Sequence, residues 1–315
     1  MWVPASFDQA AGEIIQVDAW EPDDKFPVMP LGQKPKRVLV CPTPSPHRFL
    51  IAGHRYLFKE PAGHAEQQVW SEVIAYKLAR AVGVEVPPAF LGYDGRRDSP
   101  GVLMEFFFGH GERADARFVH ARDRFQALGV KLDERRGSLA ENIKLSRQHQ
   151  VPDPRSWWAQ TLAFDTLTGN TDRHSENWGF LIRRSPDGRT SYELAPAFDN
   201  GSSLGWIVRE PDLQRHLEAA GLRRFVERGR HHYGWLSWDD GSARHIELAR
   251  RFVARHGVSR PTIARIAGIA ESKVEAVLRS CSEFDFPVRF SEQRAAFVLG
   301  QIRARRIALE QALGG

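Results

Sequence analysis

Two short stretches near the middle of this chain constrain its fold more than any other part. Residues 169–178 read Gly-Asn-Thr-Asp-Arg-His-Ser-Glu-Asn-Trp, and residues 194–201 read Leu-Ala-Pro-Ala-Phe-Asp-Asn-Gly. Asp172 precedes Asn177 by five residues, and Asp199 follows in an Asp-x-Gly setting. Phosphoryl transfer requires a carboxylate that orients the attacking hydroxyl and hard oxygen ligands that hold magnesium. The spacing therefore predicts the catalytic loop and the second metal ligand of a phosphotransferase.

The local structure predicted around the two stretches brings them together, so no long-range contact has to be assumed. A helix is predicted through the apolar residues 157–165, and it closes at Gly169, so the first stretch begins directly after its C-terminus. Residues 178–194 are predicted to form a hairpin around a Pro-Asp-Gly turn. Asp199 stands at the exit of that hairpin. The three oxygen-bearing side chains are therefore expected to converge.

Composition places the chain among globular proteins. Its 315 residues, with 42% apolar and 26% charged side chains, can form one two-lobed unit or two domains. No apolar stretch approaches the ~20 residues that span a bilayer, and no export signal is present, so a cytoplasmic protein with no membrane contact is expected. Cys41 and Cys281 lie too far apart in sequence to suggest a disulfide framework or a zinc site. A net charge of +5 suits an anionic partner, although ordinary solvated surface explains most of it.

The first third of the chain reads as strands around one helix. An edge strand is predicted near residues 14–17. Gly32, Lys34 and Lys36 precede the apolar run 38–41, where backbone N–H groups and positive charge could meet a phosphate tail. A plain turn before an edge strand explains the same residues. A hairpin is predicted to pair residues 49–51 with residues 56–59.

Lys59 ends the second strand of that hairpin among apolar residues, so it either reaches solvent or points into a nucleotide cleft. A helix is predicted from about residue 64 to residue 82, and Glu72 falls on one of its apolar faces. A carboxylate there needs a partner such as Lys59, with Glu66 as the competing candidate. A strand over residues 84–88 and a turn over residues 91–97 follow.

An apolar strand over residues 101–108 is predicted to end at Gly109. If the chain is a kinase, this strand, with Glu105 and Phe106, runs into the hinge that binds adenine; the apolar pattern alone supports a core strand equally well. The composition then becomes more charged and helical, which predicts a β-rich N-lobe over residues 1–109 and a helical C-lobe over residues 110–315. Late helices are predicted over residues 244–256, 260–267, 272–280 and 291–313.

At this point the chain resembles the HipA-like serine/threonine kinases, which occur as toxin components in bacteria. The resemblance rests on Asn170-x-Asp172-x-His174-x-x-Asn177 followed by Leu194-Ala195-Pro196-x-Phe198-Asp199. Weaker support comes from Gly32-x-Lys34-Pro35-Lys36, from Tyr56-Leu57-Phe58-Lys59 and from Ser71-Glu72-x-Ile74-Ala75-x-x-Leu78-Ala79. These pieces occur in the order of the family and cover residues 32–203. Two motifs in the right order are far rarer by chance than either one alone.

The resemblance implies an α+β, bilobal protein-kinase-like fold with a small sheet-containing lobe and a larger helical lobe. It implies ATP and Mg²⁺ as cofactors, Asp172 as the catalytic base, and Asn177 and Asp199 as metal ligands. Lys59 would contact the α- and β-phosphates with Glu72 as its partner, and the loop that carries Gly32, Lys34 and Lys36 would cover the phosphates. His174 would support the catalytic loop. The acceptor would be a protein Ser or Thr hydroxyl.

The resemblance also implies a small DNA-binding antitoxin as partner. The chain departs from the family in two respects. Lys34 and Pro35 occupy the neighbourhood where a regulatory serine is expected, and the chain is shorter than full-length members.

Three other interpretations remain open from the sequence. The segment Asp-Arg-His-x-x-Asn also resembles the catalytic loop of phosphoinositide kinases, which would make the acceptor a lipid headgroup or a small molecule. Residues 260–277 resemble a helix-turn-helix, although Glu271 and Glu275 would meet DNA phosphates poorly, so nucleic acid is not the expected partner. An inactive kinase-like binding module is disfavoured because Lys59, Asp172, Asn177 and Asp199 are all present.

Overall fold

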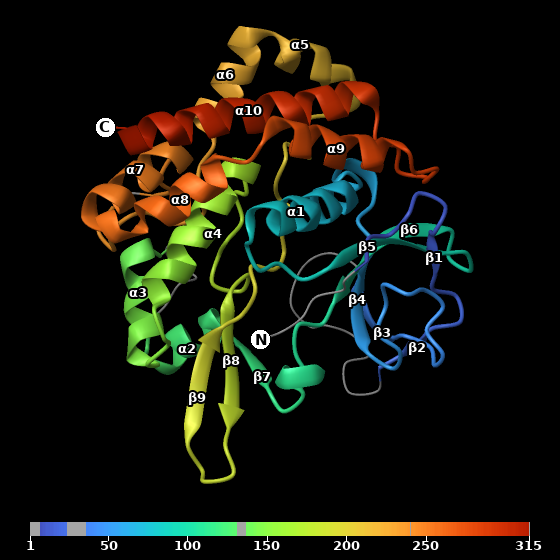
Figure 1. Cartoon of the computed structure of the whole chain (residues 1–315), viewed down its shortest axis with the longest axis horizontal. Coiled ribbons are helices and arrows are strands. Elements are labelled where there is room, and N and C mark those ends of the chain that lie inside the picture. Colours follow the sequence, from blue (N-terminus) through green and yellow to red (C-terminus); the bar gives the residue numbers. More distant parts are fainter. Residues whose placement is uncertain (1–6, 24–35, 131–136, 240, 315) are drawn as a thin grey trace.

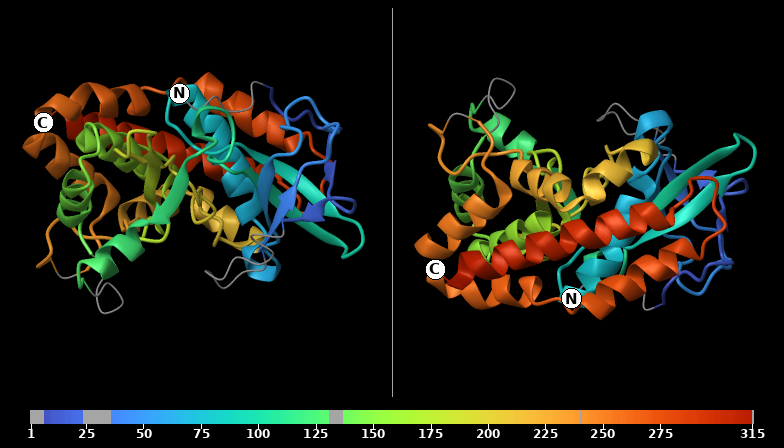
Figure 2. Two further views of the ribbon diagram at one scale, coloured as in Figure 1. Left: turned by 90° about the horizontal axis from the view of Figure 1, so that it is seen from below. Right: turned by 90° about the horizontal axis from the view of Figure 1, so that it is seen from above.

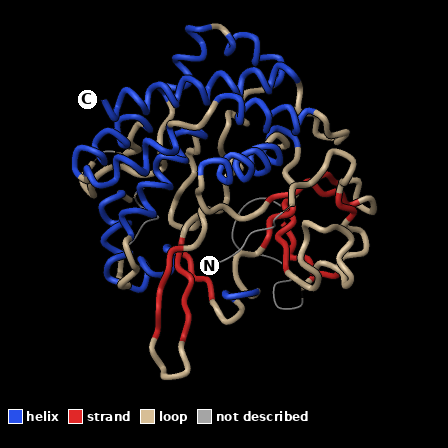
Figure 3. The backbone as a smooth tube through the Cα atoms, viewed as in Figure 1, coloured by secondary structure: helices blue, strands red, loops and turns tan. Residues whose placement is uncertain are grey.

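The chain folds into a sheet-containing N-lobe and a larger helical C-lobe in the computed structural model (Figure 1). The structure describes residues 7–23, 36–130, 137–239 and 241–314. Strands gather in the N-lobe and in one projecting hairpin, and helices make up most of the rest (Figure 3). This arrangement confirms the predicted α+β, bilobal kinase-like fold.

The N-lobe is built on a six-stranded sheet with the order β1-β5-β6-β4-β3-β2. Its strands are β1 (Ile15–Gln16), β2 (Glu21–Pro22), β3 (Lys36–Val40), β4 (Arg55–Lys59), β5 (Ala89–Asp94) and β6 (Ser99–Glu105). β3 and β4 are antiparallel and in register, so that Lys36 lies directly opposite Lys59. The two lysines therefore share one face of the sheet.

The strand pairing corrects three of the predictions. β4 pairs with β3 and β6, and residues 49–51 form no strand, so the predicted hairpin between residues 49–51 and 56–59 is wrong. Residues 84–88 are irregular, and the strand begins at Ala89 instead. Residues 91–94, predicted as a turn, belong to β5. Each error concerns a short segment, whose strand or loop state depends on which partner strand is near.

Helix α1 (Gln68–Val82) packs against this sheet and ends where the sequence indicates. Gly83 caps it with φ of 63°, a left-handed conformation that favours glycine. Trp70 on α1 is buried, donates from Nε1 to the carbonyl of Val288 at 2.7 Å, and contacts the rings of Phe284, Phe286 and Phe290. The main N-lobe helix is thereby attached to the C-terminal part of the chain.

The C-lobe helices assemble around α10, the longest of the described helices. They are α2 (Ala121–Ala127), α3 (Leu139–Gln148), α4 (Pro154–Thr168), α5 (Leu213–Leu217), α6 (Ala219–Arg228), α7 (His245–Arg255), α8 (Arg260–Ala267), α9 (Glu271–Ser282) and α10 (Glu292–Gly314). α10 contacts each of the helices from α4 to α9 and runs across one side of the molecule (Figures 1 and 2). The four predicted late helices are all confirmed, with ends that shift by one or two residues.

The suspected helix-turn-helix is part of this core. α8 packs on α4 and α10, and α9 packs on α1 and α10. Ile263, Ile266, Val274 and Leu278 are buried in those contacts. Glu271 forms an ion pair with Arg303 on α10. The apolar faces of the two helices therefore serve the packing of the C-lobe.

A second, three-stranded sheet packs against Phe107 and Phe198. Its strands are β7 (Arg117–His120), β8 (Gly179–Arg184) and β9 (Thr190–Leu194), in the order β7-β8-β9. The β8–β9 hairpin confirms the prediction for residues 178–194 and projects away from the helices (Figure 1). α4 lies between β7 and β8 in the chain and ends at Gly169, with φ of 69°, as the sequence predicted.

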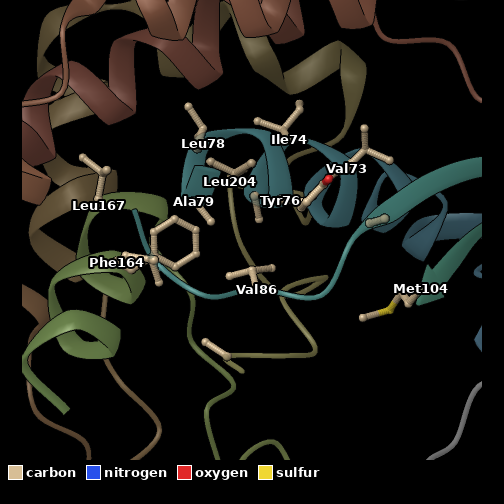
Figure 4. Close-up of a cluster of buried hydrophobic side chains, with 14 of the residues drawn as sticks. Val73, Ile74, Tyr76, Leu78, Ala79, Val86, Met104, Phe164, Leu167 and Leu204 are labelled. Carbon is tan, nitrogen blue, oxygen red and sulfur yellow. The ribbon is translucent and has the colours of Figure 1, made fainter. Parts of the chain in front are cut away.

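Apolar side chains join the two lobes behind the catalytic segments. Figure 4 shows Val73, Ile74 and Leu78 of α1 in one cluster with Phe164 and Leu167 of α4 and with Leu204. Arg113, which is 5% exposed, adds a polar link, because it bonds Glu85 after α1 at 2.9 Å and Glu193 on β9 at 2.8 Å. The predicted boundary between lobes at residue 109 stays a prediction.

Within the described ranges, none of the helices combines the length and the apolar character needed to cross a membrane. Both cysteines are buried free thiols.

We expect the Trp70→Ala substitution to lower the free energy of unfolding by about 3–5 kcal/mol, because it removes a large buried ring and leaves the Val288 carbonyl without its donor. Urea denaturation followed by far-UV circular dichroism measures this change. Trp238→Ala is the matched control, since Trp238 is 76% exposed and its loss should change stability by no more than ~0.5 kcal/mol. Equal effects of the two substitutions would contradict the packing described here.

Candidate active site

Lys59 lies between two carboxylates at the junction of the lobes. Its Nζ atom donates to Glu72 Oε1 on α1 at 2.9 Å and to Asp199 Oδ1 at 2.9 Å. The other oxygen of Glu72 accepts from the backbone N–H of Asn200 at 2.9 Å. The predicted Lys59–Glu72 pair is therefore present, and Glu66 is not the partner. The same lysine connects β4 and α1 to Asp199, the predicted metal-binding carboxylate.

The electrostatics of this cluster favour full ionisation. Burial by itself lowers the pKa of Lys59, but the charges of Asp199 and Glu72 outweigh it and hold that pKa above its usual range. Burial raises the pKa of Asp199, yet the charge and hydrogen bond of Lys59, with help from Lys36 and Arg173, bring it down to about 2. Asp199 is thus a carboxylate at neutral pH, as a ligand of a divalent cation must be.

The backbone of Asp199 is in an unusual conformation. Its φ is 57°, in the left-handed region that few residues other than Gly, Asn and Asp adopt. Contacts on both sides hold it there: Arg173 Nη1 donates to the carbonyl of Phe198, and the backbone N–H of Asn200 donates to Glu72 Oε2 at 2.9 Å. Strain of this kind is retained where several contacts determine the conformation together, as they do in functional sites.

Lys36 is close enough to Asp199 to depress the pKa of that carboxyl, which places it in the same cluster as Lys59. Two lysines opposite one another on β3 and β4 repel, and Lys59 is neutralised by its two carboxylates. Lys36 therefore adds positive charge beside Asp199. Gly32 and Lys34, the other residues predicted for the phosphate-covering loop, lie outside the described residues.

The predicted catalytic loop, residues 169–178, follows α4 directly. Asn177 Nδ2 donates to the backbone carbonyl of Asp172 at 2.7 Å and lies 3.2 Å from His174 Nε2. This orientation directs the amide nitrogen of Asn177 into the loop and leaves its Oδ1 available as an oxygen ligand. The side chain of Asp172 is 45% exposed, and Ser202 Oγ donates to its Oδ2 at 3.4 Å. His174 contacts both ends of the loop, as expected for a supporting residue.

Arg173, for which the sequence suggested no role, is the centre of the loop. It is fully buried and bonds both oxygens of Asp165 on α4, from Nε at 3.1 Å and from Nη2 at 2.8 Å. Nη1 donates to the carbonyls of Asn177 and Phe198, and Nη2 donates to Asn200 Oδ1 at 2.7 Å. One guanidinium therefore joins α4, the catalytic loop and the segment that carries Asp199.

Burial raises the pKa of Asp165, whereas in Arg173 the carboxylate outweighs burial and raises the pKa of the guanidinium. We assign both groups as charged, because two parallel hydrogen bonds between a guanidinium and a carboxylate are strongest in that state. The sequence did contain a sign of this ion pair, because Asp165 is an acidic residue in the apolar helix predicted through residues 157–165. A buried carboxylate must have a partner, and the nearest arginine along the chain supplies it.

A second buried polar cluster lies behind the start of the loop. His245 Nε2 lies 2.8 Å from the carbonyl of Asn170, and its Nδ1 lies 3.0 Å from Nη1 of Arg305 on α10. Since a guanidinium only donates, Nδ1 accepts and the proton of His245 is on Nε2. The ring of His231 lies 4.4 Å from that of His245. Burial, with the charges of Arg305 and Arg173, lowers the pKa of His231 to about 3, so this imidazole is neutral.

The predicted hinge residues lie at the end of β6. Phe106 N donates to the carbonyl of Arg55 at 3.1 Å, and the carbonyl of Phe106 lies 2.7 Å from His54 Nε2. Glu105 is buried, and its Oε2 lies 3.5 Å from the Tyr56 hydroxyl. The backbone groups of Phe106 therefore already have partners in the protein. The next residue, Phe107, stacks on Phe198 with ring centroids 5.4 Å apart.

The available oxygen ligands suit a magnesium ion that nucleotide phosphates help to hold. They are too few for a metal ion bound by protein side chains alone. Among the described residues no group of three or more His, Cys, Asp or Glu side chains could hold a metal ion. An ionised Asp199 and the free oxygen of Asn177 are two hard ligands, and Arg173 bonds the backbone next to each of them. Magnesium is commonly held by one or two such oxygens, with phosphates and water completing the shell. The residues present therefore fit Mg²⁺ with a nucleotide.

The two lobes, the Lys59–Glu72 pair and the loop that joins Asp172 to Asn177 define a protein of the protein-kinase-like class. Residues 31–276 match the model of the HipA-like C-terminal domain family, which is most of the chain. The chain belongs to this family, as the resemblance of its motifs indicated.

Two comparisons concern a Helicobacter pylori protein. A stretch of 48 residues is 50% identical to the serine/threonine-protein kinase CtkA of strain J99, and it covers 15% of this chain and 14% of that protein. The crystal structure of the H. pylori proinflammatory kinase CtkA is similar over 96% of this chain and 99% of that chain, with a TM-score of 0.75 and 19% identity. At that identity the structural similarity shows the shared fold.

A third similarity is to HipA in the Shewanella oneidensis MR-1 toxin–antitoxin complex of HipA, HipB and operator DNA. The TM-score is 0.54 at 19% identity, over 93% of this chain and 66% of that chain. This chain therefore corresponds to about two thirds of that HipA structure.

We expect Arg173→Met to lower the free energy of unfolding by about 3–5 kcal/mol, because it leaves Asp165 as a buried charge without its partner. The measurement is the urea midpoint at neutral pH. The double variant Arg173→Met with Asp165→Leu should be less destabilised than the sum of the two single variants, since it removes both charges together. Additive losses would show that the two side chains are not coupled.

The buried histidines predict a dependence of stability on pH. The pKa of His231 is about 3 in the folded chain and near 6.5 when unfolded, so only the unfolded state takes up a proton as pH falls between these values. The contribution of His231 to stability is therefore constant above pH 6.5 and falls below it, by about 1.4 kcal/mol per pH unit. We expect His231→Gln to flatten that slope in urea titrations, whereas His64→Gln, at an exposed position, should leave it unchanged.

Proposed function

We propose that this chain is an ATP-dependent serine/threonine protein kinase of the HipA type. The observation that carries the proposal is the position of Lys59, which bonds both Glu72 and Asp199, beside a loop that presents Asp172 and Asn177. Membership of the HipA-like family and the names of the CtkA relatives support the same activity. Each residue type matches a task in phosphoryl transfer.

The nucleotide phosphates are assigned to the lysine side of the site. Lys36 and Lys59 lie opposite one another on β3 and β4 and carry the positive charge that a polyphosphate needs. Asp199 and Asn177 would hold magnesium, which would neutralise charge on the phosphate oxygens. Lys59 then exchanges its bond to Asp199 for phosphate oxygens and keeps its bond to Glu72. The chain thus stabilises the charge of the nucleotide by positioning rather than by covalent chemistry.

The acceptor hydroxyl is assigned to the Asp172 side. Asp172 is partly exposed, so it can accept a hydrogen bond from an incoming hydroxyl, orient its oxygen toward the γ-phosphorus and take up its proton. Ser202 reaches the same carboxylate and helps to fix its orientation. The phosphoryl group passes to the acceptor oxygen, and ADP departs with the bridging oxygen.

The adenine is assigned to the hinge. Glu105 and Phe106 were the predicted contacts, and the bonds of Phe106 to Arg55 and His54 favour adenine recognition by the backbone just beyond it. The partly buried rings of Phe108, Phe118 and Phe198 adjoin that backbone and offer an apolar surface to a flat base.

A partner and an alternative acceptor are also proposals for this chain. HipA of S. oneidensis is found with HipB and operator DNA, which supports an antitoxin partner here as well, although the chain spans only part of that protein. A lipid or small-molecule acceptor remains the second candidate, favoured by the Asp-Arg-His-x-x-Asn spacing. The cytoplasmic location stays a prediction.

We expect wild-type protein to transfer label from γ-labelled ATP, in the presence of Mg²⁺, to itself or to a protein in bacterial lysate. Asp172→Ala should reduce transfer by about 10²–10⁴-fold while most ATP binding is retained, because the lost carboxylate acts on the acceptor hydroxyl and not on the nucleotide. Asp199→Ala should also weaken Mg²⁺-dependent nucleotide binding, measured by calorimetry. Asp187→Ala, on the exposed tip of the β8–β9 hairpin, is the matched control and should retain wild-type transfer. Undiminished turnover by the Asp172→Ala protein would refute the assigned base.

A further inference from the structure

A short antiparallel pair of segments adjoins the catalytic loop. His231 N donates to the carbonyl of Ala243 at 2.9 Å, Ala243 N donates to that of Tyr233 at 3.0 Å, and His245 N donates to that of Gly229 at 3.1 Å. We call residues 229–233 and 243–245 the flanking ladder. His245 attaches it to the start of the catalytic loop through the Asn170 carbonyl. The flanking ladder is therefore held in a fixed position beside the site.

The two faces of the flanking ladder differ in character. His231, Tyr233 and His245 are buried on its inner face. Arg230 and Arg244 form the bridge between its two segments and are both exposed. Partners in an antiparallel bridge lie on the same face, so the two guanidinium groups project side by side into solvent.

The arginine pair lies where a peptide bound at Asp172 could reach it. The ring of His232, two residues from Arg230, lies 5.3 Å from the ring of His174, and His174 Nε2 lies 3.8 Å from Asp172 Oδ1. Two imidazole rings and two residues of extended chain therefore separate Arg230 from the catalytic carboxylate, and we take this separation as roughly 15 Å, which four or five extended residues span. A peptide whose hydroxyl is at Asp172 can therefore reach both arginines.

The arginine pair places two positive charges on the exposed face of the flanking ladder. Arg230 Nη1 donates to the carbonyl of Ser242 at 2.6 Å, and in the described part of the chain neither arginine forms an ion pair with a carboxylate. Other surface arginines such as Arg209 and Arg303 do form one. Two like charges directly opposite one another destabilise a ladder. An anionic group bound between them would relieve that repulsion.

We propose that Arg230 and Arg244 select acceptors that carry a carboxylate or phosphate group three to five residues from the phosphorylated Ser or Thr. This inference rests on the proposed kinase function and adds a substrate class to it. Guanidinium groups bind both carboxylate and phosphate oxygens through paired hydrogen bonds. A peptide is favoured over nucleic acid because the pair is small and adjoins the catalytic base, whereas polynucleotides require many phosphate contacts along an extended surface.

The test uses three serine peptides of one sequence that carry glutamates, phosphoserine or glutamines at the distal positions. We expect wild-type protein with ATP and Mg²⁺ to show a KM about tenfold lower for the two anionic peptides than for the neutral one. In the double variant Arg230→Gln with Arg244→Gln this ratio should fall toward one. The glutamate and phosphoserine arms identify which anion is preferred.

Arg255→Gln is the matched control. Arg255 is exposed at the other end of α7, about 15 Å from Arg244 by the rise of the helix, and it should retain the wild-type ratio. Loss of the ratio in this variant as well would assign it to overall charge and would overturn the proposal. Equal KM values of wild-type protein for anionic and neutral peptides would also overturn it.

A binding measurement separates this inference from the kinase proposal. Fluorescence anisotropy of the labelled glutamate peptide is measured with Asp172→Asn protein, with and without the two arginine substitutions. Weaker binding after the substitutions supports the arginine pair, and unchanged binding overturns it. Stronger binding of a duplex oligonucleotide, lost with the same substitutions, would assign the pair to nucleic acid instead. If wild-type protein binds the peptide but phosphorylates neither peptide nor protein, the kinase proposal fails, and with it the role of the pair in acceptor selection.

Discussion

The buried ion pair between Arg173 and Asp165 is the interaction on which the rest of the site depends. A planar guanidinium offers five donors in a rigid geometry, and here they are shared among α4, the catalytic loop and the segment of Asp199. Because the pair is excluded from solvent, leaving any of these acceptors unpaired is costly. The relative positions of Asn177 and Asp199 therefore follow from one side chain that need not touch any ligand.

Helix α1 of the N-lobe also forms hydrogen bonds with the segment that carries Asp199. Glu72 on α1 accepts from the backbone of Asn200, and Ser71 on the same helix donates to the carbonyl of Ser203. Lys59 adds the bond between β4 and Asp199. A movement of α1 would therefore change the geometry of the proposed metal ligands directly, without an intermediate element. The apolar cluster in Figure 4 holds α1 against α4 and opposes that movement.

Much of the candidate site could be predicted because its chemistry is local in sequence. Asp172, His174 and Asn177 lie on one loop that begins at a helix C-cap glycine, and Asp199 follows one hairpin later. The pairing of Lys59 with Glu72 could be inferred because a carboxylate on an apolar helix face needs a partner. The errors arose where the state of a segment depends on distant partners. Residues 49–51 look like a strand, but β4 pairs with β3 and β6 instead.

The sequence by itself determined α4, the late helices of the C-lobe and the hairpin over residues 178–194, because periodicity, caps and turn residues act over a few turns of chain. The fold class and the proposed catalytic residues followed from motifs that resemble those of a known family. Only the tertiary structure decided the role of Arg173, the bonds of Phe106 and the exposed arginine pair of the flanking ladder. Each of these depends on which groups are brought together from distant positions and on which of them lose contact with water. Because Arg173 is buried, its guanidinium bonds several segments and fixes their positions. Because Arg230 and Arg244 are exposed, they can bind a partner.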